Sequence, residues 1–386
     1  MPESPPPPLR IGIVGAGIGG LAAACALRAA GHDVQVFEQS RQFLRVGADI
    51  NLTPNAVRAL DGLAPGIGEA VRASAARPTH RISRTWDSGE ETSRLAMGDT
   101  AEQQYGAPQL TIHRADLLAA LADAFPRERV RFGKRAQAIA QDRTTGEVTV
   151  RFADDSEAHR LDLLVGADGI HSVVRAALFG DEQPRFTGVV AFRAVVPTPR
   201  VGEVPDLGAF TKWWGPTAES QIVTFPLNQG RDTFIFATTA QDSWHEESWT
   251  TPGSVDELRE VYRDFHPHAR ALLAACDSVL KTALYERDPL PAWSQGAITL
   301  LGDACHPMMP FMAQGAGSAI EDAVVLARCV GLAGQAAGVP AALRRYEAAR
   351  QERASRIQIG SRGNNWLRAG GNADWVYGYD AWAVPV

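Results

Sequence analysis

Near the start of this 386-residue sequence, the first pattern that could support chemistry is G-x-G-x-x-G. Its glycines are Gly15, Gly17 and Gly20. Such a loop allows a tight turn, a close approach of backbone N–H groups to a pyrophosphate, and close packing of the helix that follows. Glu38 ends the next expected strand, where its carboxylate can accept hydrogen bonds from a ribose. The pattern predicts a dinucleotide site, but it does not distinguish FAD from NAD.

Two later segments distinguish the cofactor. The first runs Gly166-Ala167-Asp168-Gly169-Ile170-His171-Ser172 and ends three residues later at Arg175, and the second runs Gly302-Asp303-Ala304-Cys305-His306-Pro307 and continues to Gln314-Gly315-Ala316-Gly317. In this order, the three motifs resemble those of the single-component (group A) FAD-dependent aromatic hydroxylases. The resemblance covers nearly the whole chain. It implies an α/β fold with a Rossmann-like FAD-binding domain and an inserted, mostly antiparallel substrate domain.

The resemblance also assigns the cofactor contacts. Asp303 would hold a ribityl hydroxyl, Arg114 would reach the flavin side, and Asp168 would support both FAD and the transient nicotinamide cofactor. The helix that opens at residues 315–317 would stabilise negative charge on the flavin by up to about 2 kcal/mol. His306 is expected to be structural. The full set of expected contacts to a tightly but non-covalently bound FAD is Gly15, Gly17, Gly20, Glu38, Gln39, Arg114, Asp168, Asp303, Gly315, Ala316 and Gly317.

The reaction implied by the resemblance has two halves. NAD(P)H, with NADH favoured over NADPH, reduces FAD, and the reduced flavin adds O2 to give a C4a-hydroperoxide that hydroxylates an electron-rich ring. The protein must orient the ring and exclude water. The expected substrate is a small phenolic or heteroaromatic acid, and hydroxylation at a carbon that bears a carboxylate would also release CO2.

The substrate side is expected on segments that face the flavin in this family. Catalytic positions are expected at Asn51, Phe225, Pro310 and Phe311, and further pocket positions at Phe210, Trp214 and Pro226. Core packing is the alternative for each aromatic residue. The similarity is greatest to the 6-hydroxynicotinate 3-monooxygenase branch and next to the salicylate hydroxylases. The first branch carries titratable side chains at the positions of Asn51 and Phe311 and near Phe225. Their replacement predicts a more apolar phenol or aromatic acid, or a substrate that ionises by itself.

Strands and helices must position these motifs. A strand at residues 9–14, a helix at 18–30 and a strand at 34–37 make a βαβ unit, which implies a parallel sheet. Helical spacing recurs at 55–63, 116–125, 317–333 and 340–360, and strand patterns recur at 148–152, 161–165, 189–196, 221–225, 233–238 and 297–301. The expected domains are 9–78, 109–180 and 286–340 for FAD, 79–108 and 181–285 for substrate, a helical and aromatic C-terminal segment at 341–386, and a disordered lead-in at 1–8.

Composition excludes several classes of partner. The net charge is −6 and no basic block stands out, which argues against nucleic acid and anionic membrane. The four cysteines have no metal-site spacing, so we expect no metal and a reduced, cytoplasmic location. A monomer or homodimer is the family expectation.

Three alternatives stay open at this level. The first is a flavin hydroxylase of a larger polycyclic or alkaloid substrate. The second is a flavin oxidoreductase that does not oxygenate its substrate. The third is a flavin-binding protein without turnover.

Overall fold

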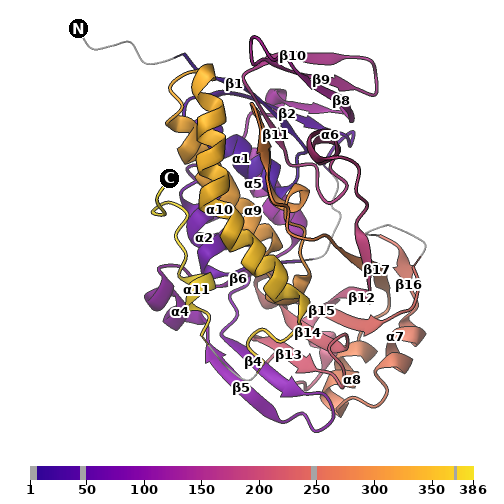
Figure 1. Cartoon of the computed structure of the whole chain (residues 1–386). Coiled ribbons are helices and arrows are strands. Elements are labelled where there is room, and N and C mark those ends of the chain that lie inside the picture. The colour runs from indigo at the N-terminus through magenta and orange to yellow at the C-terminus, as the bar shows by residue number, and fades with distance from the viewer. Residues whose placement is uncertain (1–6, 44–48, 245–249, 369–371) are drawn as a thin grey trace.

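The structure is a computed structural model that describes residues 7–43, 49–244, 250–368 and 372–386. Six of the eight residues of the expected lead-in, 1–6, lie outside this range. Two sheets dominate the architecture, one in the upper and one in the lower part of Figure 1, and the long helix α10 (Val339–Arg362) runs along both. The expected α/β fold class is confirmed.

The upper sheet has six strands in the order β18-β19-β11-β1-β2-β7. All its neighbours pair in parallel except the edge strand β18, which is antiparallel to β19. The central strands are buried and rich in Val, Ile and Leu, as expected for a parallel sheet covered on both faces. The strands are β1 (Arg10–Val14), β2 (Asp33–Glu38), β7 (Val130–Phe132), β11 (Leu163–Gly166), β18 (Ser294–Gln295) and β19 (Ile298–Leu300).

Helices and a small sheet cover this parallel sheet. Helices α1 and α9 pack against each other and share one large apolar core with the central strands. The antiparallel strands β8 (Ala136–Gln141), β9 (Val148–Phe152) and β10 (Glu157–Leu161) add Phe152, whose ring centroid lies 4.8 Å from that of Phe37. The helices of this half are α1 (Ile18–Ala29), α2 (Pro54–Asp61), α3 (Ile67–Ser74), α5 (Arg114–Asp123), α6 (Val173–Phe179) and α9 (Gly315–Gly331).

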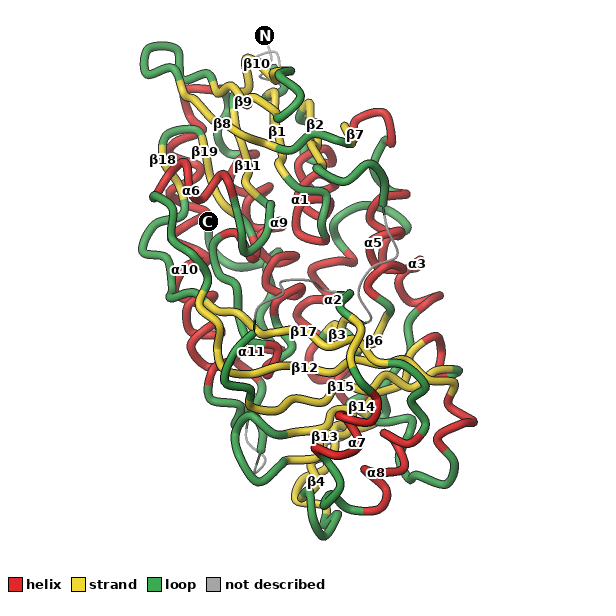
Figure 2. The backbone as a smooth tube through the Cα atoms, turned by 90° about the vertical axis from the view of Figure 1, so that its right-hand side faces the viewer, coloured by secondary structure: helices red, strands yellow, loops and turns green. Residues whose placement is uncertain are grey.

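The lower sheet has eight strands in the order β16-β17-β12-β15-β14-β13-β4-β5. It is antiparallel except where β13 and β4 pair in parallel. Figure 2 shows its strands crossing the lower part of the molecule. The strands are β4 (His80–Thr85), β5 (Glu91–Ala96), β12 (Arg185–Pro197), β13 (Phe210–Trp214), β14 (Gln221–Leu227), β15 (Asp232–Ala240), β16 (Pro252–Gly253) and β17 (Val279–Glu286).

The two faces of the lower sheet have different neighbours. Helices α7 (Val255–Val261) and α8 (Pro267–Ala274) cover one face and bury Trp213 there. The opposite face carries Phe210, Phe225, Phe234 and Phe236 toward the upper half of the molecule. A two-stranded sheet of β3 (Ile50–Leu52) and β6 (Leu110–Ile112) lies where the halves meet.

The C-terminal segment packs on both halves of the molecule. Helix α11 (Asp374–Tyr377) follows α10, and α4 (Gly98–Tyr105) lies beside it, with the Tyr105 and Tyr377 rings in edge contact at 5.7 Å. The indole Nε1 of Trp382 donates a hydrogen bond to Ala59 O at 3.2 Å. The aromatic tail therefore packs both on α4, within residues 79–108 that were expected in the substrate domain, and on α2.

Most expected elements are present with small shifts at their ends. The expected strand at 148–152 coincides with β9, and the expected helix at 317–333 begins two residues earlier, at Gly315. Helix α5 begins at Arg114 rather than at residue 116, because His113 caps it: its ring accepts a hydrogen bond from Ala115 N at 3.2 Å. A histidine cap lies outside the usual capping set of Ser, Thr, Asp and Asn.

Candidate active site

The glycine-rich loop after β1 has the geometry of a phosphate cradle. Gly15 has φ +103°, and a Cβ there would lie 2.3 Å from Ala167 O, so only glycine fits. A Cβ at Gly20 would lie 2.0 Å from Gly15 O, which shows how closely α1 starts against the turn. Gly17, in contrast, faces open space and lines the cavity described below. The N-terminus of α1 and this open backbone fit a dinucleotide pyrophosphate.

Acidic side chains hold the loops around this cradle. Glu38, at the end of β2, accepts hydrogen bonds from Ala16 N and Ser40 N, both at 2.8 Å. Asp168 caps α6 by accepting from Val173 N at 2.7 Å and from the Ser172 hydroxyl. Burial raises the pKa of Asp168 despite these bonds. Gln39 is exposed beside Glu38.

Further residues that were expected to contact the cofactor lie at β19, α5 and α9, and together with the glycine-rich loop they form what we call the cofactor groove. Arg114, Asp303, Gly315 and Ala316 all line the cavity. Burial by surrounding protein raises the pKa of Asp303, while the nearby His306 and Arg114 oppose that shift; the surface that Asp303 exposes faces the cavity. Gly317 does not line the cavity, because it packs on α2, where a Cβ would lie 3.1 Å from that of Ala56. The groove offers a helix N-terminus, a carboxylate and a guanidinium to a bound flavin.

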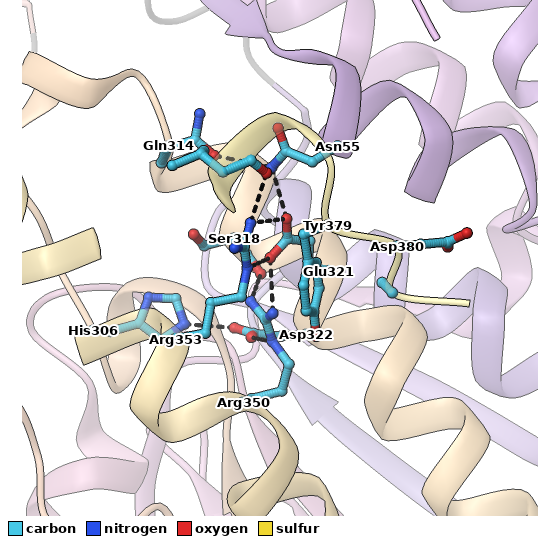
Figure 3. Close-up of polar contacts among 12 residues, drawn as sticks. Asn55, His306, Gln314, Ser318, Glu321, Asp322, Arg350, Arg353, Tyr379 and Asp380 are labelled. Carbon is cyan, nitrogen blue, oxygen red and sulfur yellow. Dashed lines mark hydrogen bonds and ion pairs between the residues drawn. The ribbon is translucent and has the colours of Figure 1, made fainter. Parts of the chain in front are cut away.

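A buried polar network supports the start of α9 (Figure 3). Gln314, which precedes the helix, accepts a hydrogen bond from Asn55 at 3.0 Å, and Asn55 also donates to Glu321 at 2.7 Å. Glu321 forms ion pairs with Arg350 at 2.8 Å and Arg353 at 3.0 Å. The network therefore ties the N-terminus of α9 to both α2 and α10.

The network continues on the other side of α9 at Asp322. Its carboxylate accepts from Arg350 at 2.8 Å and lies 2.6 Å from His306 Nε2. Burial raises the pKa of Asp322, but His306 and Arg350 outweigh burial and bring it to about 2. Burial lowers the pKa of His306, but Cys305 and Asp322 outweigh it and raise the pKa well above its usual value. His306 is thus a buried cation matched by a carboxylate.

One cavity of about 500 Å³ lies between the cofactor groove and the lower sheet. Its floor follows from strand register, because directly paired residues share a face. One row crosses the sheet from Leu280 through Arg193, Phe236 and Val223 to Lys212. A second row contains Phe225 and Phe210, whose rings stack at 5.5 Å with an interplanar angle of 6°, and continues to Arg81.

The cavity includes most but not all of the expected substrate residues. Asn51, Phe210, Phe225, Pro310 and Phe311 line it. The other two expected pocket positions do not.

Trp214 and Pro226 are buried elsewhere in the wall. Pro226 O accepts a hydrogen bond from the Thr111 hydroxyl at 2.6 Å, and the Trp214 ring lies 3.6 Å from Lys212 Nζ. Pro226 directly follows Phe225 on β14, and because side chains alternate along a strand, it points away from the cavity. Trp214 shares the face of Lys212 but lies beyond it along β13.

Four charged residues of this cavity were not predicted from the sequence. Asp49, Arg81, Arg193 and Lys212 all line it. Arg81, Arg193 and Lys212 lie in strands whose polar and apolar residues alternate in the ordinary way, and Asp49 directly precedes β3, so no local motif indicates a role for them. Only the parallel pairing of β4 with β13 brings Arg81 beside Phe210. The cavity therefore carries charged side chains besides the non-titrating residues at 51, 225 and 311.

Comparison with known proteins decides the family. A family model described as "FAD binding domain" matches residues 9–359. The 6-hydroxynicotinate 3-monooxygenase of Bordetella bronchiseptica is 40% identical over 381 residues, which cover 98% of this chain and 97% of that protein. The chain belongs to the FAD-dependent aromatic monooxygenases.

Further relatives agree with this membership. The 3-hydroxybenzoate 6-hydroxylase of Polaromonas naphthalenivorans is 36% identical. The aligned region covers 92% of this chain and 87% of that protein. A salicylate hydroxylase substrate complex superimposes with a TM-score of 0.82 at 27% identity, covering 97% of this chain and 96% of that one. The family resemblance drawn from the three motifs is confirmed. Within the described residues, no helix is both long and apolar enough to cross a membrane.

Proposed function

We propose that this monooxygenase hydroxylates the ring of a small aromatic acid, with NADH as the reductant of FAD and O2 as the oxidant. One observation carries the proposal: a single cavity is lined by cofactor-side residues, such as Gly17 and Asp303, and by the stacked rings of Phe210 and Phe225. A ring lying on these phenylalanines would therefore face the flavin groove. The relatives named for hydroxynicotinate and hydroxybenzoate support this class of substrate.

Bound FAD would supply hydride acceptance and oxygen activation. The chain's own residues would hold it along the groove. Gly15, Gly17 and Gly20 would admit the pyrophosphate, and Glu38 with Gln39 would bind the adenosine ribose. Asp168, Arg114 and Asp303 would fix the middle of the cofactor. The N–H groups of Gly315 and Ala316, which line the cavity, would face the flavin ring, where the helix dipole favours negative charge.

The aromatic residues would orient the substrate and keep water away from the reacting atoms. Phe225 and Phe210 would form the floor, while Phe311 and Pro310 lie on the cofactor side of the same cavity. Asn51 Oδ1 accepts a hydrogen bond from Gln109 Nε2 at 2.8 Å, while Asn51 Nδ2 is buried and has no hydrogen-bond partner among the residues that the structure describes. We assign to this free donor a hydrogen bond to the substrate.

Asp49 supplies the titratable group that the sequence did not reveal. It lines the cavity, and burial raises its pKa to about 6 while Arg193 opposes that shift. A carboxylate with a pKa near the working pH is suited to accept a proton. We assign to Asp49 the acceptance of the proton from a ring hydroxyl, which makes the ring more electron-rich.

The cavity volume bears on the size of the substrate. About 500 Å³ must hold the reacting part of the flavin as well as the substrate, which favours one aromatic ring over a polycyclic one. The four cysteines are free and buried, and they support the proposal of a cytoplasmic protein. We further propose that the protein is a monomer or a homodimer.

A substrate panel under ¹⁸O2 tests this function. Salicylate, 3-hydroxybenzoate and 6-hydroxynicotinate are each added to the holoenzyme, and NADH oxidation, peroxide and product mass are measured. We expect at least one acid to stimulate NADH oxidation and to gain one ¹⁸O atom per NADH consumed. Stimulated NADH oxidation whose product never carries ¹⁸O would instead indicate a flavin oxidoreductase.

A further inference from the structure

Arg81 and Lys212 place two positive charges on the cavity face of the lower sheet. Arg81 pairs directly with Phe210 across β4 and β13, and Lys212 lies two residues beyond Phe210 on the same face. Both side chains line the cavity, although their residues are only 5% and 3% exposed. They form one cationic end of the floor on which the aromatic substrate would lie.

No acidic side chain in the described ranges pairs with either cation. Arg81 Nη1 is buried without a hydrogen-bond partner, and the guanidinium rests 4.7 Å above the Phe210 ring. Lys212 Nζ donates to Asn364 Oδ1 at 2.6 Å and lies over the Trp214 ring. Each of these contacts is with a neutral group, so the two charges remain uncompensated.

The other cation of the floor differs. Arg193 lies at the opposite end of the row, three strands from Lys212, or about 14 Å at the usual strand spacing. The carboxylate of Asp49 interacts with it electrostatically, and its guanidinium donates to the Thr282 hydroxyl. Arg193 is thus compensated within the protein, whereas Arg81 and Lys212 are not.

Burying two like charges near each other is unfavourable unless an anion joins them. Burial lowers the pKa of Lys212 well below its usual value, and repulsion from Arg81 and Arg368 lowers it further. An anion between the two side chains would relieve this repulsion and satisfy Arg81 Nη1. A planar carboxylate suits a guanidinium and an ammonium at once.

We propose that Arg81 and Lys212 form an anion subsite that binds the carboxylate of the aromatic substrate and so fixes which ring carbon faces the flavin. The inference rests on the proposed function and deepens it by naming the group that is recognised. Asn364 is a positioning residue: it holds Lys212 through Oδ1, and its Nδ2 donates to Ala218 O at 2.5 Å. The segment after α10 thereby fixes one wall of the subsite.

Binding of matched acids and amides to the FAD holoenzyme tests the subsite. The probes are 3-hydroxybenzoate against 3-hydroxybenzamide and salicylate against salicylamide, followed by the change in flavin absorbance. We expect the wild type to bind at least one acid more tightly than its amide. Arg81→Met and Lys212→Met should weaken that acid by roughly tenfold to hundredfold and the amide by less than about threefold. Lys212→Arg should retain most of the preference.

Arg84→Met is the matched control. Arg84 lies on the same strand but on the opposite face, where it pairs with Asp206 at 2.6 Å, so the acid preference should not change. FAD content is measured for every variant to confirm that the holoenzyme is intact. Equal losses for acid and amide in Arg81→Met and Lys212→Met, or a wild type with no acid preference, would overturn the subsite. Acid preference without ¹⁸O incorporation would leave the subsite standing and reject the proposed monooxygenation.

Discussion

The network behind α9 and the floor of the cavity both bury charged side chains, but they balance them differently. In the network, Glu321 and Asp322 face Arg350, Arg353 and His306 at ion-pair distances. At the Arg81 end of the cavity, the contacts that Arg81 and Lys212 make with other described residues are with aromatic rings and an amide. Charged side chains that are paired within the protein tie helices together. They stabilise the native state only while both partners are present. Burying a charge without a partner is costly, and a ligand of opposite charge would remove that cost, which is why we infer a binding site at Arg81 and Lys212.

The largest expected effect concerns the network. Asp322→Asn should lower the free energy of unfolding by about 3–5 kcal/mol, because it leaves the buried His306 without its carboxylate and removes one of the two carboxylates that pair with Arg350. Chemical denaturation of the holoenzyme measures this. Arg72→Met, which removes an exposed pair with Asp61, should cost no more than about 1 kcal/mol. Similar losses for the two variants would contradict the contrast drawn between buried and exposed pairs.

The same variant has a pH signature. The pKa of Asp322 is lowered to about 2 from 3.8, so its contribution to stability is present above the unfolded pKa and is lost as pH falls toward about 2. The difference in unfolding free energy between wild type and Asp322→Asn should therefore shrink from about pH 4 to about pH 2. A difference that stays constant through this range would show that Asp322 is not ionised in the native state.

The next effect concerns the acid group of the cavity. Asp49→Asn should lower the rate of substrate hydroxylation roughly a hundredfold while leaving FAD content unchanged, because it removes the proton acceptor. In the wild type the rate should rise with pH through about 6, where Asp49 loses its proton, and this rise should vanish in the variant. The measurement is product formation against pH with a saturating substrate. A rise that persists in Asp49→Asn would assign the titration to another group.

A carboxylate introduced into the cavity would pair with the cations there, and the cavity floor would then resemble the network behind α9. Val223 pairs directly with Lys212 on the cavity floor, so Val223→Glu should compensate the lysine from within the protein. We expect acid binding to fall tenfold or more. Val223→Gln, of the same shape but uncharged, should keep most of the preference for acid over amide. Equal acid binding in the two variants would show that Lys212 does not contact the substrate anion.

The smallest effect is the pH dependence of acid binding. The ammonium of Lys212 binds the anion, and its lowered pKa means that acid affinity should fall severalfold as pH rises through that pKa. Among the described residues, the charged groups that face Lys212 are Arg81 on β4 and Arg368 of the C-terminal segment, and the neutral ones are Asn364, Trp214 and Phe311. Lys212→Arg should flatten the profile. A profile that is unchanged in Lys212→Arg would exclude Lys212 as its origin.

The expected cofactor side carries local sequence motifs, whereas the charged residues on the substrate side of the cavity carry none, for a physical reason. Gly15, Gly17 and Asp303 lie in contiguous loops at strand ends, where local backbone geometry dictates residue type, so each motif can be recognised by itself. Arg81 and Lys212 meet only because β4 and β13, far apart in the chain, pair in parallel. Asp49 also carries no local sequence signal, because a single carboxylate before a short strand has many ordinary explanations. Register across distant strands, which sets this half of the site, has no local signal.

A crystal structure of the holoenzyme with 3-hydroxybenzoate, or with whichever aromatic acid binds most tightly, tests the central claim most directly. The distances from the carboxylate oxygens to Arg81 Nη1 and Lys212 Nζ are the decisive measurement. We predict both to be hydrogen bonds of about 2.7–3.0 Å, with the ring over Phe210 and Phe225. A carboxylate bound instead at the Arg193 end of the floor, beside Asp49, would contradict the account.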